Sequence, residues 1–166
     1  MNYPELLKLA APETIVVLTA LAVLAVDLTS MRGLDARLRF TIGGMLASVG
    51  CAAAIAWMLV MPAHANALEG MLVVDPLTQL VKVALLALTI FTVLISIEGK
   101  FTEHVGEYLA LILLATVGMM FLVSAEDILM IFVSLELTSL SLYILTEFNK
   151  RDIKSVVAAL KYCLLG

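Results

Sequence analysis

The stretch 128-ILMIFVSLELTSLSLYIL-145 contains eighteen residues, and only one of them, Glu136, carries a charge. An α-helix of this length measures about 27 Å, which is close to the hydrocarbon thickness of a bilayer. Lipid offers no partners for unpaired backbone groups, so a spanning segment of this kind must be helical. The stretch therefore predicts a transmembrane helix with a carboxyl group near its middle.

The composition of the whole chain agrees with a membrane protein. Of its 166 residues, 63% are hydrophobic and 14% are charged, and the mean hydropathy is +1.10. Soluble domains are about 45–50% apolar, so a soluble fold of this length could not bury so much apolar surface. The net charge of −4 is scattered and the chain has no basic patch, which argues against a nucleic-acid partner.

Further apolar runs divide the chain into a series of spans. Complete spans are predicted near 14–28, 40–61, 77–97, 108–123 and 128–145, and another run begins near 155 and is still apolar at 166. We therefore predict an all-α fold, a polytopic transmembrane helix bundle with five complete spans and the start of a sixth. Residues 1–166 are treated as a single transmembrane domain. The interrupted last run leads us to expect a fragment of a longer chain.

The basic residues between the runs predict the orientation in the membrane. The odd connections (29–39, 98–107 and 146–155) hold seven Lys or Arg residues, whereas the N-terminal tail and the even connections hold one, Lys8. Basic loops stay in the cytoplasm. The sequence therefore predicts an N-terminus outside the cytoplasm.

Glu136 is the main candidate for a functional residue. A carboxyl group at the centre of a spanning helix costs about 3 kcal/mol to insert on translocon scales. Helical spacing places Ser139 and Tyr143 on its face, which makes a polar stripe of a carboxyl, a hydroxyl and a phenol. The opposite face carries small hydroxylated residues suited to close helix packing, namely Ser134, Thr138 and Ser141. We expect both faces to be covered by protein.

Two interpretations of Glu136 remain open at this stage. A carboxyl whose surroundings change can gain and lose a proton, as a proton relay requires. A permanently protonated Glu136 could instead only tie two helices together by hydrogen bonds. Lys161 is the candidate relay partner, although its stem is also long enough to reach the membrane surface.

The other polar residues of the runs are assigned structural roles. Lys82 is predicted to extend to the membrane surface, and Asp27, Asp75, Glu126 and Asp127 are predicted to be helix caps or interface charges. Cys51 and Cys163 are predicted to be buried and unpaired, the Met residues to be packing groups, and the two His residues to bind no metal. No cofactor-binding residue is expected.

The last sixty residues resemble the antiporter-like membrane subunits of respiratory complex I. The resemblance rests on 118-GMM-120, 124-SAEDIL-129, 132-FVSLELTSLSLYIL-145, a basic loop and 158-AALKY-162, in that order. Within these subunits the pattern is most similar to subunit N of the bacterial NADH:quinone oxidoreductase family, whose mitochondrial and chloroplast counterparts are called subunit 2. The first hundred residues match more loosely, through helix spacing and 75-DPL-77.

This resemblance implies a function for the candidate residues. The embedded glutamate of the family's proton channel falls on Glu136, and the lysine of its A-L-K-Y motif falls on Lys161. The family pairs its glutamate mainly with a lysine on a broken seventh helix, which this sequence does not contain. The implied enzyme is a proton-translocating complex of class 7.1.1 in the bacterial inner (plasma) membrane. NADH, FMN, iron–sulfur clusters and quinone are expected in partner subunits, and this chain is expected to hold no redox centre.

Three other functions are considered. A subunit of a multi-subunit sodium/proton antiporter, or of a membrane-bound hydrogenase, shares the same architecture, although the form S-L-E-L-T-S-L-S-L-Y favours subunit N. A purely structural membrane-arm subunit is the second alternative. An enzyme with its own active site is disfavoured, because no nucleophile and base are paired in the sequence.

Overall fold

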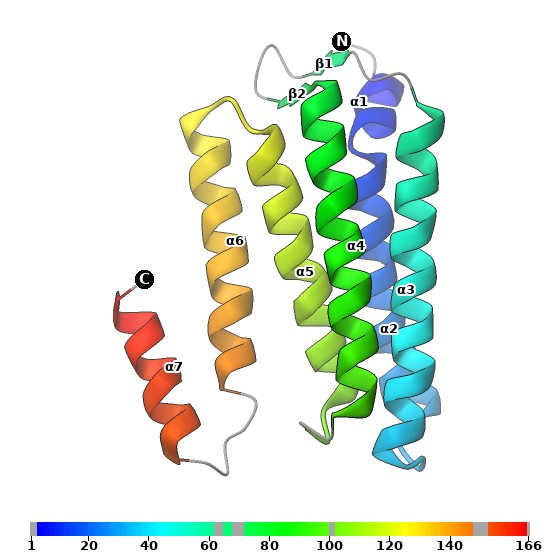
Figure 1. Ribbon diagram of the computed structural model, residues 1–166, viewed down its shortest axis with the longest axis vertical. Coiled ribbons are helices and arrows are strands. Elements are labelled where there is room, and N and C mark those ends of the chain that lie inside the picture. Colours follow the sequence, from blue (N-terminus) through cyan, green and yellow to red (C-terminus); the bar gives the residue numbers. More distant parts are fainter. Residues whose placement is uncertain (1–2, 62–64, 68–71, 100–101, 148–152, 166) are drawn as a thin grey trace.

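A computed structural model describes residues 3–61, 65–67, 72–99, 102–147 and 153–165 of the chain, and it shows a bundle of long helices (Figure 1). The helices are α1 (Tyr3–Leu9), α2 (Ala11–Ser30), α3 (Ala36–Val60), α4 (Pro76–Glu98), α5 (Val105–Ser124), α6 (Ile128–Thr146) and α7 (Ile153–Leu165). Five of them, α2 to α6, are long and apolar enough to cross a membrane. The predicted all-α polytopic bundle is therefore confirmed.

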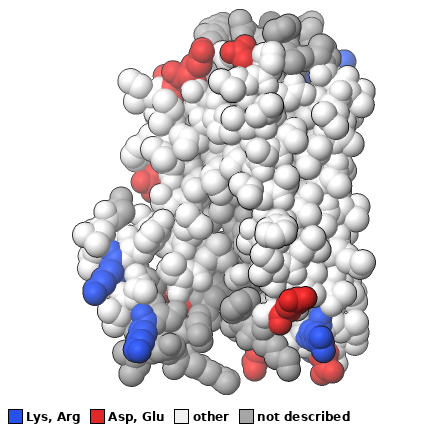
Figure 2. All heavy atoms as spheres, viewed as in Figure 1, with Lys and Arg blue, Asp and Glu red and all other residues white. Residues whose placement is uncertain are grey.

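One end of the bundle carries elements that the sequence did not predict. Strands β1 (Ala65–Ala67) and β2 (Leu72–Val74) pair antiparallel, with Asn66 opposite Val73. In Figure 1 this hairpin lies at the same end as α1 and the start of α4, and it contacts both helices. The charged side chains visible in Figure 2 gather mainly toward the two ends, while the broad middle of the molecule is mostly uncharged.

An aspartate stands immediately before α4 and before α6, and a proline opens α4. Pro76 is the first residue of α4, where its missing N–H costs nothing, and Asp75 before it has an extended backbone. Asp127 holds the same position before α6. Neither aspartate side chain makes a capping hydrogen bond, so only the positions of the predicted caps are correct.

Helix α5 occupies the centre of the bundle, where it packs against α2, α3, α4 and α6. Of its most apolar eighteen residues, 61% are buried, against 11% for α6. Its buried side chains point in several directions and include Leu109, Leu113, Val117 and Met120. A helix that is apolar all round belongs in an interior, and α5 is therefore the core element of the bundle.

Small side chains bring α5 and α6 close together. A Cβ atom added to Gly118 of α5 would collide with the Thr138 hydroxyl and come within 3.2 Å of the Ser134 carbonyl oxygen. Ser134 and Ser141 of α6 are buried, and their hydroxyls donate to carbonyls of their own helix. The predicted packing face of α6 is thus confirmed, and its hydroxyl groups have partners.

Candidate functional site

Glu136 lies in the middle of α6 on the face turned away from α5. Its side chain is exposed in this chain, and the apolar neighbours on its face, Leu129, Phe132 and Leu140, are 67%, 61% and 53% exposed. The buried residues of α6 are Ser134 and Ser141, on the opposite face. Among the described residues, α6 contacts α5 on one side and α7 near Tyr143, so coverage of the face with Glu136 by a larger bundle stays a prediction.

The polar stripe next to Glu136 meets α7 through an aromatic contact. Ser139 and Tyr143 are partly buried, and the Tyr143 ring packs edge-on against Tyr162, with centroids 4.9 Å apart. Lys161 precedes Tyr162 on α7 and is exposed. Across the described segments, no ion pair joins Lys161 to Glu136. The structure brings Tyr143 to α7, and the pairing of Glu136 with Lys161 stays a prediction.

A buried ion pair links α2 to α4, and the sequence analysis missed it. Lys82 Nζ donates to Glu13 Oε1 at 2.5 Å, and the two side chains are only 4% and 3% exposed. The prediction that Lys82 reaches the membrane surface is therefore wrong: its ammonium group finds a carboxylate inside the bundle instead. Glu13 was overlooked because it precedes the first predicted span and lies 69 positions from Lys82.

Lys82 belongs to a regular buried row on α4. The buried residues of this helix are Lys82, Leu86, Thr89, Val93 and Ser96, a spacing of four and three residues in alternation. The polar members recur every seven residues, and each has a polar partner on another helix. Thr89 shares a 2.8 Å hydrogen bond with Thr116, and Ser96 lies 3.3 Å from the hydroxyl of Tyr108.

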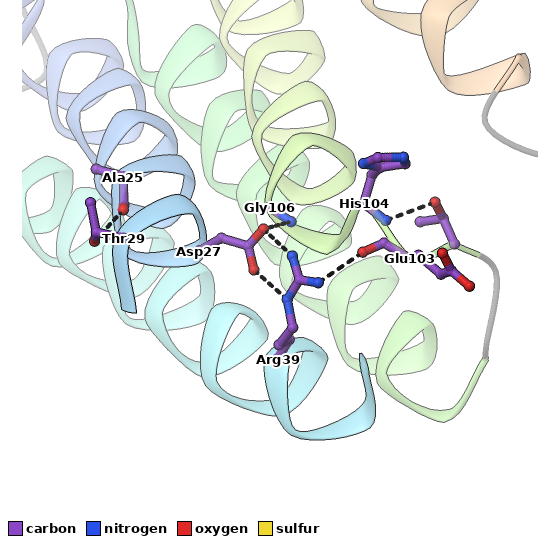
Figure 3. A network of polar contacts seen from close by, with 8 residues as sticks. Ala25, Asp27, Thr29, Arg39, Glu103, His104 and Gly106 are labelled. Carbon is purple, nitrogen blue, oxygen red and sulfur yellow. Dashed lines mark hydrogen bonds and ion pairs between the residues drawn. The ribbon is translucent and has the colours of Figure 1, made fainter. Parts of the chain in front are cut away.

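A second ion pair ties three helices together at the other end of the bundle (Figure 3). Arg39 of α3 donates to both carboxylate oxygens of Asp27 on α2, from Nε at 2.8 Å and from a terminal nitrogen at 2.5 Å. Asp27 Oδ2 also accepts the backbone N–H of Gly106, in the first turn of α5, at 3.1 Å. Asp27 is thus neither an ordinary cap nor an interface charge, because it binds two other helices. Arg39, which was counted as a loop residue, lies in α3.

The two cysteines are free, as predicted. Cys51 is buried, whereas Cys163 is exposed on α7, contrary to the prediction. Within the residues that the structure describes, no three His, Cys, Asp or Glu side chains lie close enough together to hold a metal ion.

Comparison with known proteins identifies related membrane subunits. The family model described as "NADH:quinone oxidoreductase/Mrp antiporter, TM" matches residues 125–166, a segment that includes Glu136 and Lys161. The whole chain aligns at 41% identity with NADH-quinone oxidoreductase subunit N 2 of Acidobacterium capsulatum, and it covers 35% of that protein.

Relatives from other bacteria agree with this match. NAD(P)H-quinone oxidoreductase subunit 2 of a Synechocystis strain is 37% identical, and NADH-quinone oxidoreductase subunit N of an Anaeromyxobacter strain is 34% identical. Each alignment covers 93% of this chain and 30% of the relative. The chain spans about a third of the length of these relatives. Over almost all of its own length it is similar to the NADH:quinone oxidoreductase subunits called subunit N or subunit 2.

Proposed function

We propose that the chain works in the membrane arm of an NADH:quinone oxidoreductase and takes part in proton translocation. The observation that carries this proposal is Glu136, a carboxyl group in the middle of the spanning helix α6 and inside the segment that matches the antiporter family. Ionisable groups at this depth usually mark ion or proton pathways. The partners are then other membrane-arm subunits and the bilayer.

In this proposal, Glu136 carries a proton by changing its ionisation state. Apolar surroundings favour a neutral carboxyl group, and an approaching cation favours the ionised form. A lysine that moves toward Glu136 and away again would therefore release and recover the proton. Lys161 and a lysine elsewhere in the full-length protein are the candidates, and the hydroxyls of Ser139 and Tyr143 would pass the proton along the same face.

We assign the electron chemistry to other subunits of the complex. NADH, FMN, iron–sulfur clusters and quinone would be bound there, and this chain would respond through charge and conformation. The basic connections of the chain support an orientation in the bacterial inner membrane with the N-terminus outside. Arg39 contributes less to that argument than the other basic residues, because it is held by Asp27.

The test is Glu136→Gln in the full-length protein within its native complex. We expect inverted membrane vesicles to keep the assembled complex but to lose most NADH-driven acidification, measured with a pH-sensitive dye beside NADH oxidation. Glu126→Gln is the matched control, because it makes the same change at an exposed position just before α6. Full acidification by an assembled Glu136→Gln complex would contradict the proposal.

A sodium/proton antiporter subunit is the second candidate, since the description of the matching family also names the Mrp antiporter. The same vesicles separate the two functions. If NADH drives no acidification in the wild type but a sodium gradient does, the antiporter function replaces the one proposed.

A further inference from the structure

Helix α7 meets α6 at the Tyr143 end of the polar stripe. The Tyr162 ring packs edge-on against the Tyr143 ring, with centroids 4.9 Å apart and an interplanar angle of 73°. Other apolar side chains of α7, such as Leu160 and Leu164, are exposed. Among the described residues, the aromatic pair is therefore the main side-chain contact that can fix the position of α7 along α6.

This contact sets the register between the two helices. Helix α7 runs back along α6 in the opposite direction, and it begins beyond the end of α6 (Figure 1). Because Tyr162 lies opposite Tyr143, its neighbour Lys161 is level with the last turns of α6. Glu136 stands seven residues before Tyr143. The observed register therefore holds the backbone of Lys161 about two turns, or about 10 Å, along the helix axis from that of Glu136.

The directions of the side chains widen this gap. Long side chains on a helix lean toward the N-terminus of their own helix. Tyr143 is therefore expected to lean toward the level of Glu136, whereas Lys161, on the antiparallel helix, is expected to lean away from it. In this register the phenol of Tyr143 comes closer to Glu136 than the ammonium group of Lys161 does.

We propose that Tyr162 is a positioning residue of the proton relay: its ring docks α7 on Tyr143 and so sets the distance between Lys161 and Glu136. The inference rests on the proposed function of Glu136, because this distance matters only if the lysine acts on that carboxyl group. Packed helices can shift past one another by a turn, which is about 5.4 Å. Without the ring, α7 can slide by such a step, and Lys161 loses the resting position to which it returns after each movement.

The contact assigns this role to the ring of Tyr162 and not to its hydroxyl. The two rings meet edge to face, and such a pair depends on the charge distribution of an aromatic ring, which Phe shares with Tyr. Leu offers apolar bulk without an aromatic edge, so it cannot restore the pair. The variants Tyr162→Phe and Tyr162→Leu therefore separate the positioning role of the ring from simple apolar packing.

The first measurement tests the contact in the complete complex in lipid. Persulfate with a light-activated ruthenium complex removes one electron and one proton from each of two neighbouring tyrosines, and a carbon–carbon bond then joins their rings. We expect mass spectrometry to find a cross-linked peptide pair that contains Tyr143 and Tyr162 and that is absent from Tyr162→Phe. A wild-type complex without this cross-link would overturn the proposal.

The second measurement uses inverted vesicles that hold the full-length protein in its native complex. We expect Tyr162→Leu to assemble and to oxidise NADH but to lose most of its acidification per NADH oxidised, whereas Tyr162→Phe keeps the wild-type value. Tyr3→Leu is the matched control, because it makes the same change at an exposed tyrosine of α1 and should leave acidification unchanged.

Each other outcome contradicts the positioning role. Wild-type acidification by Tyr162→Leu would show that the ring is not needed, and a loss in an assembled Tyr162→Phe complex would show that the hydroxyl acts instead. Failure of Tyr162→Leu to assemble, while Tyr162→Phe assembles, would leave a structural role only. Glu136→Gln is measured in parallel: if it acidifies fully, the proposed relay itself has failed, whereas the cross-link still reports on the contact between α6 and α7.

Discussion

Replacement of Lys82 by Met should destabilise the bundle far more than loss of one surface charge. Met keeps most of the stem volume but removes the ammonium group, and it leaves the Glu13 carboxylate, of which 3% is exposed, without a cation. Breaking a buried pair in this way costs about 3–5 kcal/mol. The unfolding equilibrium constant should therefore rise about 140- to 3,700-fold, at about 1.4 kcal/mol for each factor of ten.

Removal of both charges should restore most of this stability. In Glu13→Leu/Lys82→Met no charge remains to be buried, and such replacements of buried pairs are often neutral or stabilising. The double variant is therefore expected to unfold at nearly the same detergent concentration as the wild type. Each single variant is expected to unfold at a much lower concentration.

The measurement is detergent-driven unfolding of the 166-residue chain, followed by the fluorescence of its single tryptophan, Trp57. This residue adjoins Met58, whose carbonyl accepts the bond from Gln79, so its signal reports on the end of the bundle that holds the pair. Lys8→Met is the matched control at an exposed lysine, and it should change the unfolding free energy by less than about 0.5 kcal/mol. Equal effects of Lys82→Met and Lys8→Met would refute the reasoning, as would a double variant no more stable than the singles.

Two further changes probe the contacts between helices. Gly118→Ala should lower the free energy of unfolding by about 1–3 kcal/mol, because the added methyl group meets the Thr138 hydroxyl and the backbone of α6. Gly33→Ala is the control: Gly33 has open space around it, so the same unfolding assay should show no change. A Gly118→Ala protein as stable as Gly33→Ala would show that α5 and α6 separate easily. Asp27→Asn should lower the free energy of unfolding by about 1.5–3 kcal/mol, since it removes charge-assisted hydrogen bonds from Arg39. Thermal unfolding at the wild-type temperature would contradict the bonding seen at Asp27.

The membrane spans could be predicted because lipid imposes a simple rule on the sequence. A run such as 77–97 must be helical and about as long as the bilayer is thick, so its type and approximate limits follow from apolar length alone. The packing face of α6 could also be predicted, since Ser134, Thr138 and Ser141 recur at helical spacing. These features depend on residues close to one another in the chain.

The ion pairs could not be predicted by the same reasoning. Lys82 near a helix start looks like a residue that reaches the membrane surface, and nothing within its own run reveals that Glu13 comes to meet it. Arg39 looked like part of a basic loop for the same reason. One signal was available: the polar residues of α4 at 82, 89 and 96 recur every seven positions, which is typical of a helix face packed against other helices. The surroundings of Glu136 depend on what packs against the open face of α6, which the residues of α6 do not specify.

The central place of α5 has a consequence for how the protein is made. A ribosome delivers α2, α3 and α4 to the membrane before α5, yet α5 is the helix on which all three pack. The first three spans can pack on one another, α2 on α3 and α3 on α4, but the surfaces that they turn toward α5 stay uncovered until that helix arrives. The Asp27–Arg39 pair forms between α2 and α3, so the two charges can neutralise each other in the meantime, and the amide of Gly106 then completes the contact as α5 enters.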